Sequence, residues 1–231
     1  YTEDTNLKVE YTGDGLENGL PKNAGSYTAS LTIKDESDNP YTAKLNFEIQ
    51  KATPNVGTVT ADVLSDTLDT TQVKLSRENE TVPGTLKLKE GTELQWGTYD
   101  YDWIFIPEDS TNYNSVEETV SVTVKDTVAP TAEWQIGTSG WRKFVNTITL
   151  GYLCKNTETM EIQFSDNLSG VKEKQYCIAD SEIKDFSNVE WINYTLPIVL
   201  PLGPQKFVYV RVTDNAGNVA ILNSVGIVVY Q

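Results

Sequence analysis

The sequence contains no histidine, and this absence excludes several kinds of chemistry. Catalytic triads with histidine, zinc sites with histidine ligands and haem sites held by histidine are all impossible. Two cysteines are too few for a cysteine-rich metal site, and neither phosphate-binding pattern, GxGxxG or GxxxxGK[ST], occurs. Catalysis would depend on carboxylate, serine or lysine chemistry alone, and we expect that the protein is not an enzyme.

Long apolar runs are also missing. No run reaches the ~18 apolar residues of a membrane helix, so we expect no direct membrane insertion. The given sequence shows no signal peptide and no initiator methionine, so we expect an internal piece of a longer protein. The chain has 18 basic and 33 acidic side chains, a net charge of −15, which argues against nucleic acid as a partner.

An internal repeat organises the first half of the chain. The segment GSYT at 25–28 recurs as GTYD at 97–100, an offset of 72 residues. Further aligned pairs, the last two after one inserted residue, are Tyr41 with Tyr113, Phe47 with Val120, and Ile49 with Val122. About 45 residues separate Pro54 from Gly97, but only 24 precede Gly25, so the repeat predicts that the first copy lacks roughly its first twenty residues. We therefore expect that Tyr1 marks a boundary inside a module; the alternative is a shorter first module.

Both copies alternate apolar and polar residues with the period of a half-buried β-strand. The apolar positions are Tyr27, Ala29, Leu31 and Ile33 in the first copy, and Tyr99, Tyr101, Trp103 and Phe105 in the second. Turn-rich segments follow at 35–40 and 107–112, and then come second alternating strands at 45–49 and 120–124. No stretch has a convincing helical spacing of apolar residues.

The segment 128–231 differs from the repeats but is also rich in strand patterns. Strand candidates are residues 148–154, 160–164, 208–212 and 225–229, and turn clusters lie at 137–140, 165–170 and 214–218. The segment therefore predicts a sandwich of about seven strands and ~100 residues, the size of an immunoglobulin-like domain.

Together these patterns predict an all-β protein made of tandem immunoglobulin-like β-sandwich modules in an extended arrangement. The modules are residues 1–51, a repeat truncated at its N-terminus; 52–127, the second repeat; and 128–231, a distinct sandwich. Charge divides at the same place, because residues 1–127 carry a net −13 and residues 128–231 a net −2. Solubility and repulsion along a surface rod explain this acidity better than an acidic binding face does.

Several short motifs resemble modules of bacterial surface proteins. Residues 20–27 (LPKNAGSY), 49–54 (IQKATP) and 107–113 (PEDSTNY) resemble the immunoglobulin-like repeats often called MBG. Residues 126–130 (DTVAP), 166–171 (DNLSGV) and 210–218 (VRVTDNAGN) are similar to another bacterial immunoglobulin-like module. The resemblance implies an extracellular protein, secreted or attached to the bacterial cell wall and surface. It supplies no ligand and no catalytic residue.

Two oxygen-rich turns are candidates for a calcium site, the only cofactor that the sequence suggests. The candidate ligands are Asp166, Asn167, Asp214 and Asn215, and the acidic junction around Asp126 could add more. Calcium is bound by several carboxylate and carbonyl oxygens gathered in one place. Neither turn has EF-hand spacing, and tight turns favour Asp and Asn without any metal, so turn chemistry is the simpler interpretation.

Irregularly placed aromatic residues are candidates for a binding surface. Trp134, Trp141, Trp191 and Tyr194 do not follow the strand alternation, and exposed aromatic rings can stack on sugars or bind protein. Packing in a core or between domains is the simpler interpretation, because large aromatic side chains are usually buried. An exported protein permits a disulfide between the two cysteines, although a buried free thiol is favoured.

The sequence leaves two functions open. The first is a non-catalytic extracellular array of modules, a spacer or stalk with a role in adhesion. Its partner would be a host or cell-surface glycan or protein, and the chain would be a monomer. The alternative is a set of accessory, carbohydrate-binding domains in a large secreted enzyme that acts on polysaccharide. The residues before Tyr1 and after Gln231 would discriminate between the two.

Overall fold

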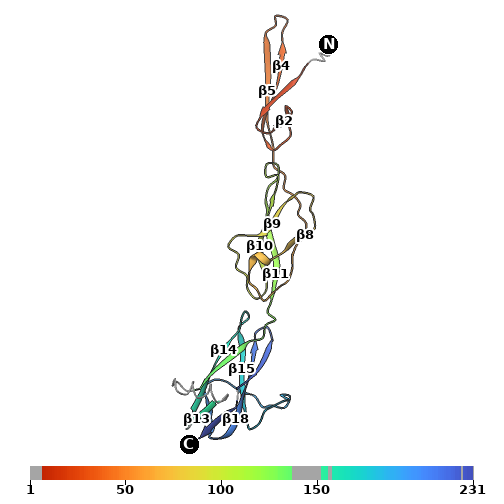
Figure 1. Ribbon diagram of the computed structural model, residues 1–231. Helices are drawn as coiled ribbons and strands as arrows, with labels where there is room; N and C mark the ends of the chain where they lie inside the picture. Colours follow the sequence, from red (N-terminus) through yellow and green to blue (C-terminus); the bar gives the residue numbers. More distant parts are fainter. Residues whose placement is uncertain (1–6, 137–151, 156–157, 225, 231) are drawn as a thin grey trace. The chain divides into compact units, whose positions relative to one another are not determined.

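The computed structural model describes residues 7–136, 152–155, 158–224 and 226–230 (Figure 1). The regular secondary structure of these residues is β-strand, apart from one turn of 3-10 helix at Thr70–Gln72, which confirms the all-β prediction. None of the helical structure in these ranges is long and apolar enough to cross a bilayer. The chain divides into two compact units: Tyr1–Asp62, Thr70–Glu93 and Tyr99–Val122 form one, and Val63–Asp69, Leu94–Thr98 and Thr123–Gln231 form the other. The module boundaries proposed above remain a prediction.

The first repeat forms an antiparallel sheet in the order β1-β4-β5. Its strands are β1 (Val9–Gly13), β4 (Gly25–Lys34) and β5 (Pro40–Ile49), and a hairpin of β2 (Leu16–Glu17) and β3 (Leu20–Pro21) joins β1 to β4. The two predicted strands of this copy are therefore confirmed. Their predicted half-burial is wrong over much of the sheet, because Ile33 is 50% exposed and Leu45 is 66% exposed.

The second repeat has the same pair of central strands, but with further strands around them. One sheet has the order β7-β11-β10-β9, and a second, two-stranded sheet pairs β6 with β8. The strands are β6 (Val59–Ala61), β7 (Leu64–Ser65), β8 (Leu75–Arg77), β9 (Gly84–Leu88), β10 (Gly97–Pro107) and β11 (Val116–Lys125). Trp103 and Phe105 of β10 are almost completely buried, as the alternation predicts, whereas Tyr99 on the same predicted face is 47% exposed. The guanidinium carbon of Arg77 lies 4.2 Å from the centre of the Phe105 ring, so β8 helps to cover this face.

The C-terminal segment forms a sandwich of two sheets, as predicted. One sheet contains β12 (Thr131–Ile136), β14 (Glu158–Ser165) and β17 (Ile198–Leu200). The other has the order β13 (Tyr152–Lys155), β20 (Ile227–Tyr230), β18 (Gly203–Asp214), β15 (Val171–Ala179) and β16 (Ile192–Asn193), and β19 (Val219–Asn223) also pairs with β18. The predicted strands at 160–164 and 208–212 lie in β14 and β18. The predicted turn at 137–140 and the first part of the strand at 148–154 lie outside the described residues.

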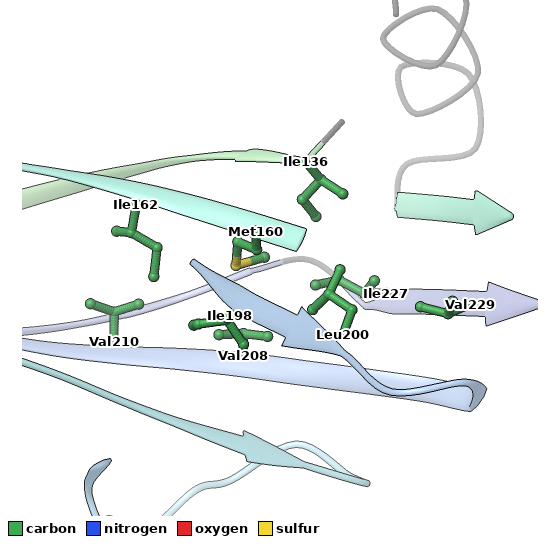
Figure 2. Close-up of a cluster of buried hydrophobic side chains, with 9 residues drawn as sticks. All are labelled: Ile136, Met160, Ile162, Ile198, Leu200, Val208, Val210, Ile227 and Val229. Carbon is green, nitrogen blue, oxygen red and sulfur yellow. The ribbon is translucent and has the colours of Figure 1, made fainter. Parts of the chain in front are cut away.

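A compact apolar cluster holds the two sheets of this sandwich together (Figure 2). Its members come from β12, β14, β17, β18 and β20: Ile136, Met160, Ile162, Ile198, Leu200, Val208, Val210, Ile227 and Val229. Met160, Leu200 and Ile227 have no exposed surface. Full burial of a side chain of this size contributes about 1.5–3 kcal/mol, so this core fixes the strands whose ends carry the acidic turns.

Candidate functional site

Three aspartates meet at one end of the C-terminal sandwich. Asp126 lies in the connection from β11 to β12, Asp166 directly follows β14, and Asp214 is the last residue of β18. One carboxylate oxygen from each lies within 4.8 Å of one from each of the other two. Asp214 is completely buried and Asp126 is 7% exposed, so water provides little compensation for their charges.

Each carboxylate is held by the backbone of its own turn. Asp166 Oδ2 accepts hydrogen bonds from the N–H groups of Leu168 (3.1 Å) and Gly170 (2.7 Å). Asp214 accepts from the backbone N–H and the side-chain amide of Asn218, both at 2.8 Å. These bonds make tight turns, which is the role that turn chemistry predicts for such residues.

Asp126 adds a link between separate segments. Its Oδ2 accepts a hydrogen bond from the N–H of Ser169 at 2.9 Å, and its Oδ1 accepts one from Val128 at 3.1 Å. Its backbone carbonyl accepts a bond from the side-chain amide of Asn218 at 3.1 Å. The connection between β11 and β12 is thereby attached to both acidic turns, and the aspartates are positioned by fixed backbone rather than by free loops.

One oxygen of the cluster has no partner. Asp166 Oδ1 is shielded from solvent and accepts no hydrogen bond from any described residue. Among the described residues, no lysine or arginine forms an ion pair with Asp126, Asp166 or Asp214. Close carboxylates without a cation repel one another, and burial strengthens that repulsion. The cluster therefore has the charge and the free acceptor atom that suit a bound cation.

The donor set favours calcium among the common cations. Ca²⁺ takes six to eight oxygen ligands at flexible angles, whereas zinc sites usually include nitrogen or sulfur. Three carboxylates supply the charged part of such a shell, and backbone carbonyls and water can supply the rest. The cluster could not act as a nucleophile–base pair of the histidine type, because the chain has no histidine.

The structure brings together only part of the predicted calcium set. Asp166 and Asp214 lie in the cluster. Asn167 is exposed and makes no described contact with the cluster. Asn215 directs its side-chain amide nitrogen to the carbonyls of Ser169 (2.8 Å) and Gly170 (3.0 Å), which is a structural role. Asp126, which the sequence suggested only as a member of an acidic junction, is the third carboxylate.

The aromatic binding candidates that the structure describes have different surroundings. Trp134 is half-buried against the sandwich core, and Tyr194 contacts that core. The hydroxyl of Tyr194 accepts a hydrogen bond from the N–H of Ile162 at 2.8 Å. Trp141 lies outside the described residues. Core packing therefore accounts for Trp134 and Tyr194.

Trp191 is the aromatic candidate that lies apart from this core. Its ring stacks on Phe186 at a centroid distance of 6.1 Å, and the Arg211 guanidinium lies 4.9 Å from its centre. The same guanidinium donates two hydrogen bonds to Gln175 Oε1, at 2.6 and 2.8 Å. Contacts within the protein therefore account for the position of this ring.

One shallow depression lies elsewhere, on the second repeat. Its volume is about 380 Å³, and its lining includes Lys89, Glu90, Glu93, Asp100 and Asp102. Lys89 forms an ion pair with Glu117 at 2.6 Å, and the bond to that carboxylate raises the pKa of Lys89. Asp100 accepts a hydrogen bond from the Ser121 hydroxyl. The depression is open and its carboxylates are exposed, which is the arrangement of solvated strand charges.

Comparison with known proteins gives structural likenesses only. No family model and no curated protein matches the sequence. A structure of protocadherin gammaB7 EC3-6 is 12% identical with a TM-score of 0.32, and the match covers 96% of this chain and 66% of that one. Fibronectin(III)-like modules of Clostridium thermocellum CbhA are 14% identical, with a TM-score of 0.27, and the match covers 75% and 95%.

A calcium-stabilised adhesin with which an Antarctic bacterium binds ice is 14% identical, with a TM-score of 0.28. That match covers 89% of this chain and 57% of the adhesin chain. The sheets described above establish an all-β architecture, with a sandwich of two sheets in the C-terminal segment. At such low identity and TM-score, these likenesses carry neither a ligand nor a role over to this chain.

Proposed function

We propose that the chain is a non-catalytic, extracellular array of immunoglobulin-like modules from a bacterial surface or secreted protein. We also propose that Asp166 and Asp214 of the C-terminal module bind Ca²⁺ together with Asp126, which lies in the connection just before that module. The array acts as a spacer or stalk and takes part in adhesion. One observation supports the calcium site above all. Asp166 has a solvent-shielded oxygen without a partner in a cluster of three carboxylates that includes no described cationic group.

Calcium suits this proposed function because of what it would join. The three aspartates come from segments that are far apart in sequence, and their mutual repulsion opposes the packing of this end of the module. A divalent cation reverses the sign of that interaction. Any ligand that binds only the folded state raises stability, by about 2.7 kcal/mol at a hundred times its dissociation constant. The module would thus become more resistant to unfolding where calcium is plentiful.

Calorimetric titration of the chelator-treated chain with CaCl₂ tests the site. We expect one bound ion per chain, weaker binding in Asp214→Asn and unchanged binding in Asp185→Asn. Asp185 is a matched control because its carboxylate accepts a hydrogen bond from the N–H of Ser187 at 2.9 Å. The Asp166 carboxylate accepts the corresponding bond from Leu168 at 3.1 Å. Binding that is absent, or equally strong in Asp214→Asn, would refute the calcium site.

A separate screen tests the adhesive role. The 231-residue chain would be applied to glycan and mucin arrays, once with calcium and once with chelator. Binding that depends on calcium and on Asp214 supports adhesion by the C-terminal module. No binding under either condition removes the adhesive part of the proposal and leaves the spacer role. The alternative function is a carbohydrate-binding accessory domain, and the internal contacts of Trp191 and Tyr194 disfavour it. Glycan binding that Trp191→Ala abolishes would support that alternative.

A further inference from the structure

The first repeat has one apolar face and one polar face. The register β1-β4-β5 aligns Val9 with Leu31, Leu31 with Ala43, Ile33 with Tyr41 and Ala29 with Leu45, so all these side chains lie on one face. The opposite face carries polar residues that hydrogen-bond across the strands, such as Thr32 with Thr42 at 2.8 Å. Sheets of this kind normally place the apolar face against a second layer.

Much of this apolar face has no second layer in the described structure. Tyr27 is buried, because its ring stacks on Phe47 at a centroid distance of 5.5 Å. Farther along the same strands, Val9 is 42% exposed and Tyr41 is 59% exposed. Together with Ile33 and Leu45 they form a contiguous apolar surface, which we call the open face. Apolar surfaces of this kind on a folded protein usually mark an interaction site.

The second repeat shows what covers the equivalent face. The offset of 72 residues aligns Ile33 with Phe105, which has no exposed surface. Arg77 of β8 covers part of Phe105. Val56 and Leu64, which like Arg77 precede β10 in the chain, are also buried. The chain that precedes β10 therefore contributes to the cover over Phe105 through β8.

The strand order identifies which part is missing from the first repeat. β4 and β5 correspond to β10 and β11. β1 pairs with the outer edge of β4, as β9 pairs with the outer edge of β10. The other edge of β11 pairs in parallel with β7, at Val124 and Leu64, whereas β5 is the last strand of its described sheet. The described part of the first repeat therefore lacks counterparts of β6, β7 and β8.

We propose that the open face binds a β-segment equivalent to β6–β8, supplied by polypeptide on the N-terminal side of Tyr1. In the second repeat the covering segment precedes the central strands, and the same chain order places its counterpart before Gly25. This segment would bring apolar side chains over Leu31 and Ile33 and would pair with the free edge of β5. The proposal rests on packing in the first repeat and is independent of the calcium site.

Cysteine labelling tests the proposal in two polypeptides: the 231-residue chain, and the same chain extended by about forty residues of its natural upstream sequence. Leu45→Cys reports on the open face, and Lys44→Cys is the matched control on the polar face of the same strand. Labelling by a maleimide reagent is quantified for each peptide by mass spectrometry, which separates the new thiol from the native ones. Tyr41→Cys serves as a second reporter should Leu45→Cys disturb the extended protein.

We expect the thiol of Leu45→Cys to react about tenfold or more slowly in the extended polypeptide, and the thiol of Lys44→Cys to react equally in both. Equal labelling at position 45 in both polypeptides, or an upstream sequence without apolar alternation, would overturn the proposal. The proposal would also be overturned if labelling of Leu45→Cys in the 231-residue chain became slower as protein concentration rose. The partner would then be a second copy of the chain. Hydrogen exchange of β5 in the unmodified proteins provides an independent check, since a paired edge exchanges more slowly.

Discussion

Asp166→Asn should stabilise the C-terminal module without calcium and destabilise it, relative to the wild type, with calcium. The substitution keeps the shape of the side chain and one acceptor for the N–H groups of Leu168 and Gly170. It replaces the unpartnered oxygen with an amide that can donate to the neighbouring carboxylates. It also removes one of three negative charges that lie within 4.8 Å of one another.

The magnitude follows from Coulomb's law. Two unit charges 4.8 Å apart repel by about 3.5 kcal/mol at an effective dielectric constant of about 20. Solvent reduces this value because Asp166 is only half-buried, so we expect a net gain of about 1–3 kcal/mol in the metal-free protein. For a domain of ~100 residues, that gain raises the melting temperature by roughly 5–15 °C.

Differential scanning calorimetry in chelator and in calcium measures both effects. In chelator, the variant should melt above the wild type. In saturating calcium, the wild type should gain about 2.7 kcal/mol at a hundred times its dissociation constant, and the variant should gain much less, which reverses the order. Asp185→Asn should change neither melting temperature. The reasoning is refuted if Asp166→Asn melts below the wild type in chelator and responds to calcium to the same extent.

Three further predictions concern stability and reactivity. Gly84→Ala should destabilise the second repeat by about 1–3 kcal/mol in urea unfolding, because the added Cβ would lie 2.5 Å from the buried Phe105 ring; unchanged stability would contradict this packing. Hydrogen bonds from the hydroxyl and N–H of Thr127 lower the pKa of Asp66 below its ordinary 3.8. The stability from these bonds is present above that ordinary value and is lost as pH falls through the lower, folded-state pKa. Asp66→Asn should therefore flatten the decline in melting temperature below about pH 4, and an unaltered decline would argue against it. Burial raises the pKa of the Cys177 thiol above 9.0, so a disulfide reagent should modify it only after unfolding, and rapid modification of the native chain would contradict its burial.

The sequence was sufficient for the features that depend on neighbouring residues. Strict alternation predicted β4, β10 and β11, and clusters of Asp, Asn and Gly predicted the turns after β14 and β18. Gly170 and Gly217 have φ angles of 82° and 95°, the left-handed conformation for which glycine is favoured. In each case the cause lies within a few residues of the chain, so the pattern contains the information.

Features that depend on distant partners could not be predicted in this way. β15 begins Val-Lys-Glu-Lys-Gln, which is too polar to indicate a strand, and it forms because β18 pairs with it from Val171 to Ala179. The same limit applied to the candidate calcium ligands. Asp166 and Asn167 are equally good ligands by sequence. The assembled strands place the Asp166 carboxylate within 4.8 Å of those of Asp126 and Asp214, whereas Asn167 is exposed. The short-range signal for Asp126 was its place in an acidic junction, which does not fix where its side chain lies.

The two repeats show the same limit at the level of a whole face. β4 and β10 have the same alternation, yet Ile33 is half-exposed and its counterpart Phe105 is completely buried. Alternation specifies which face of a strand is apolar, because neighbouring side chains point to opposite sides. Whether that face is covered depends on other strands, which the second repeat has in β6–β8. An apolar surface of this size exposed to water is unfavourable and promotes pairing at the free edge of β5. The sheet β1-β4-β5 is therefore expected to be less stable than its counterpart until a second layer covers it, and hydrogen exchange of β4 against β10 in the 231-residue chain would measure the difference.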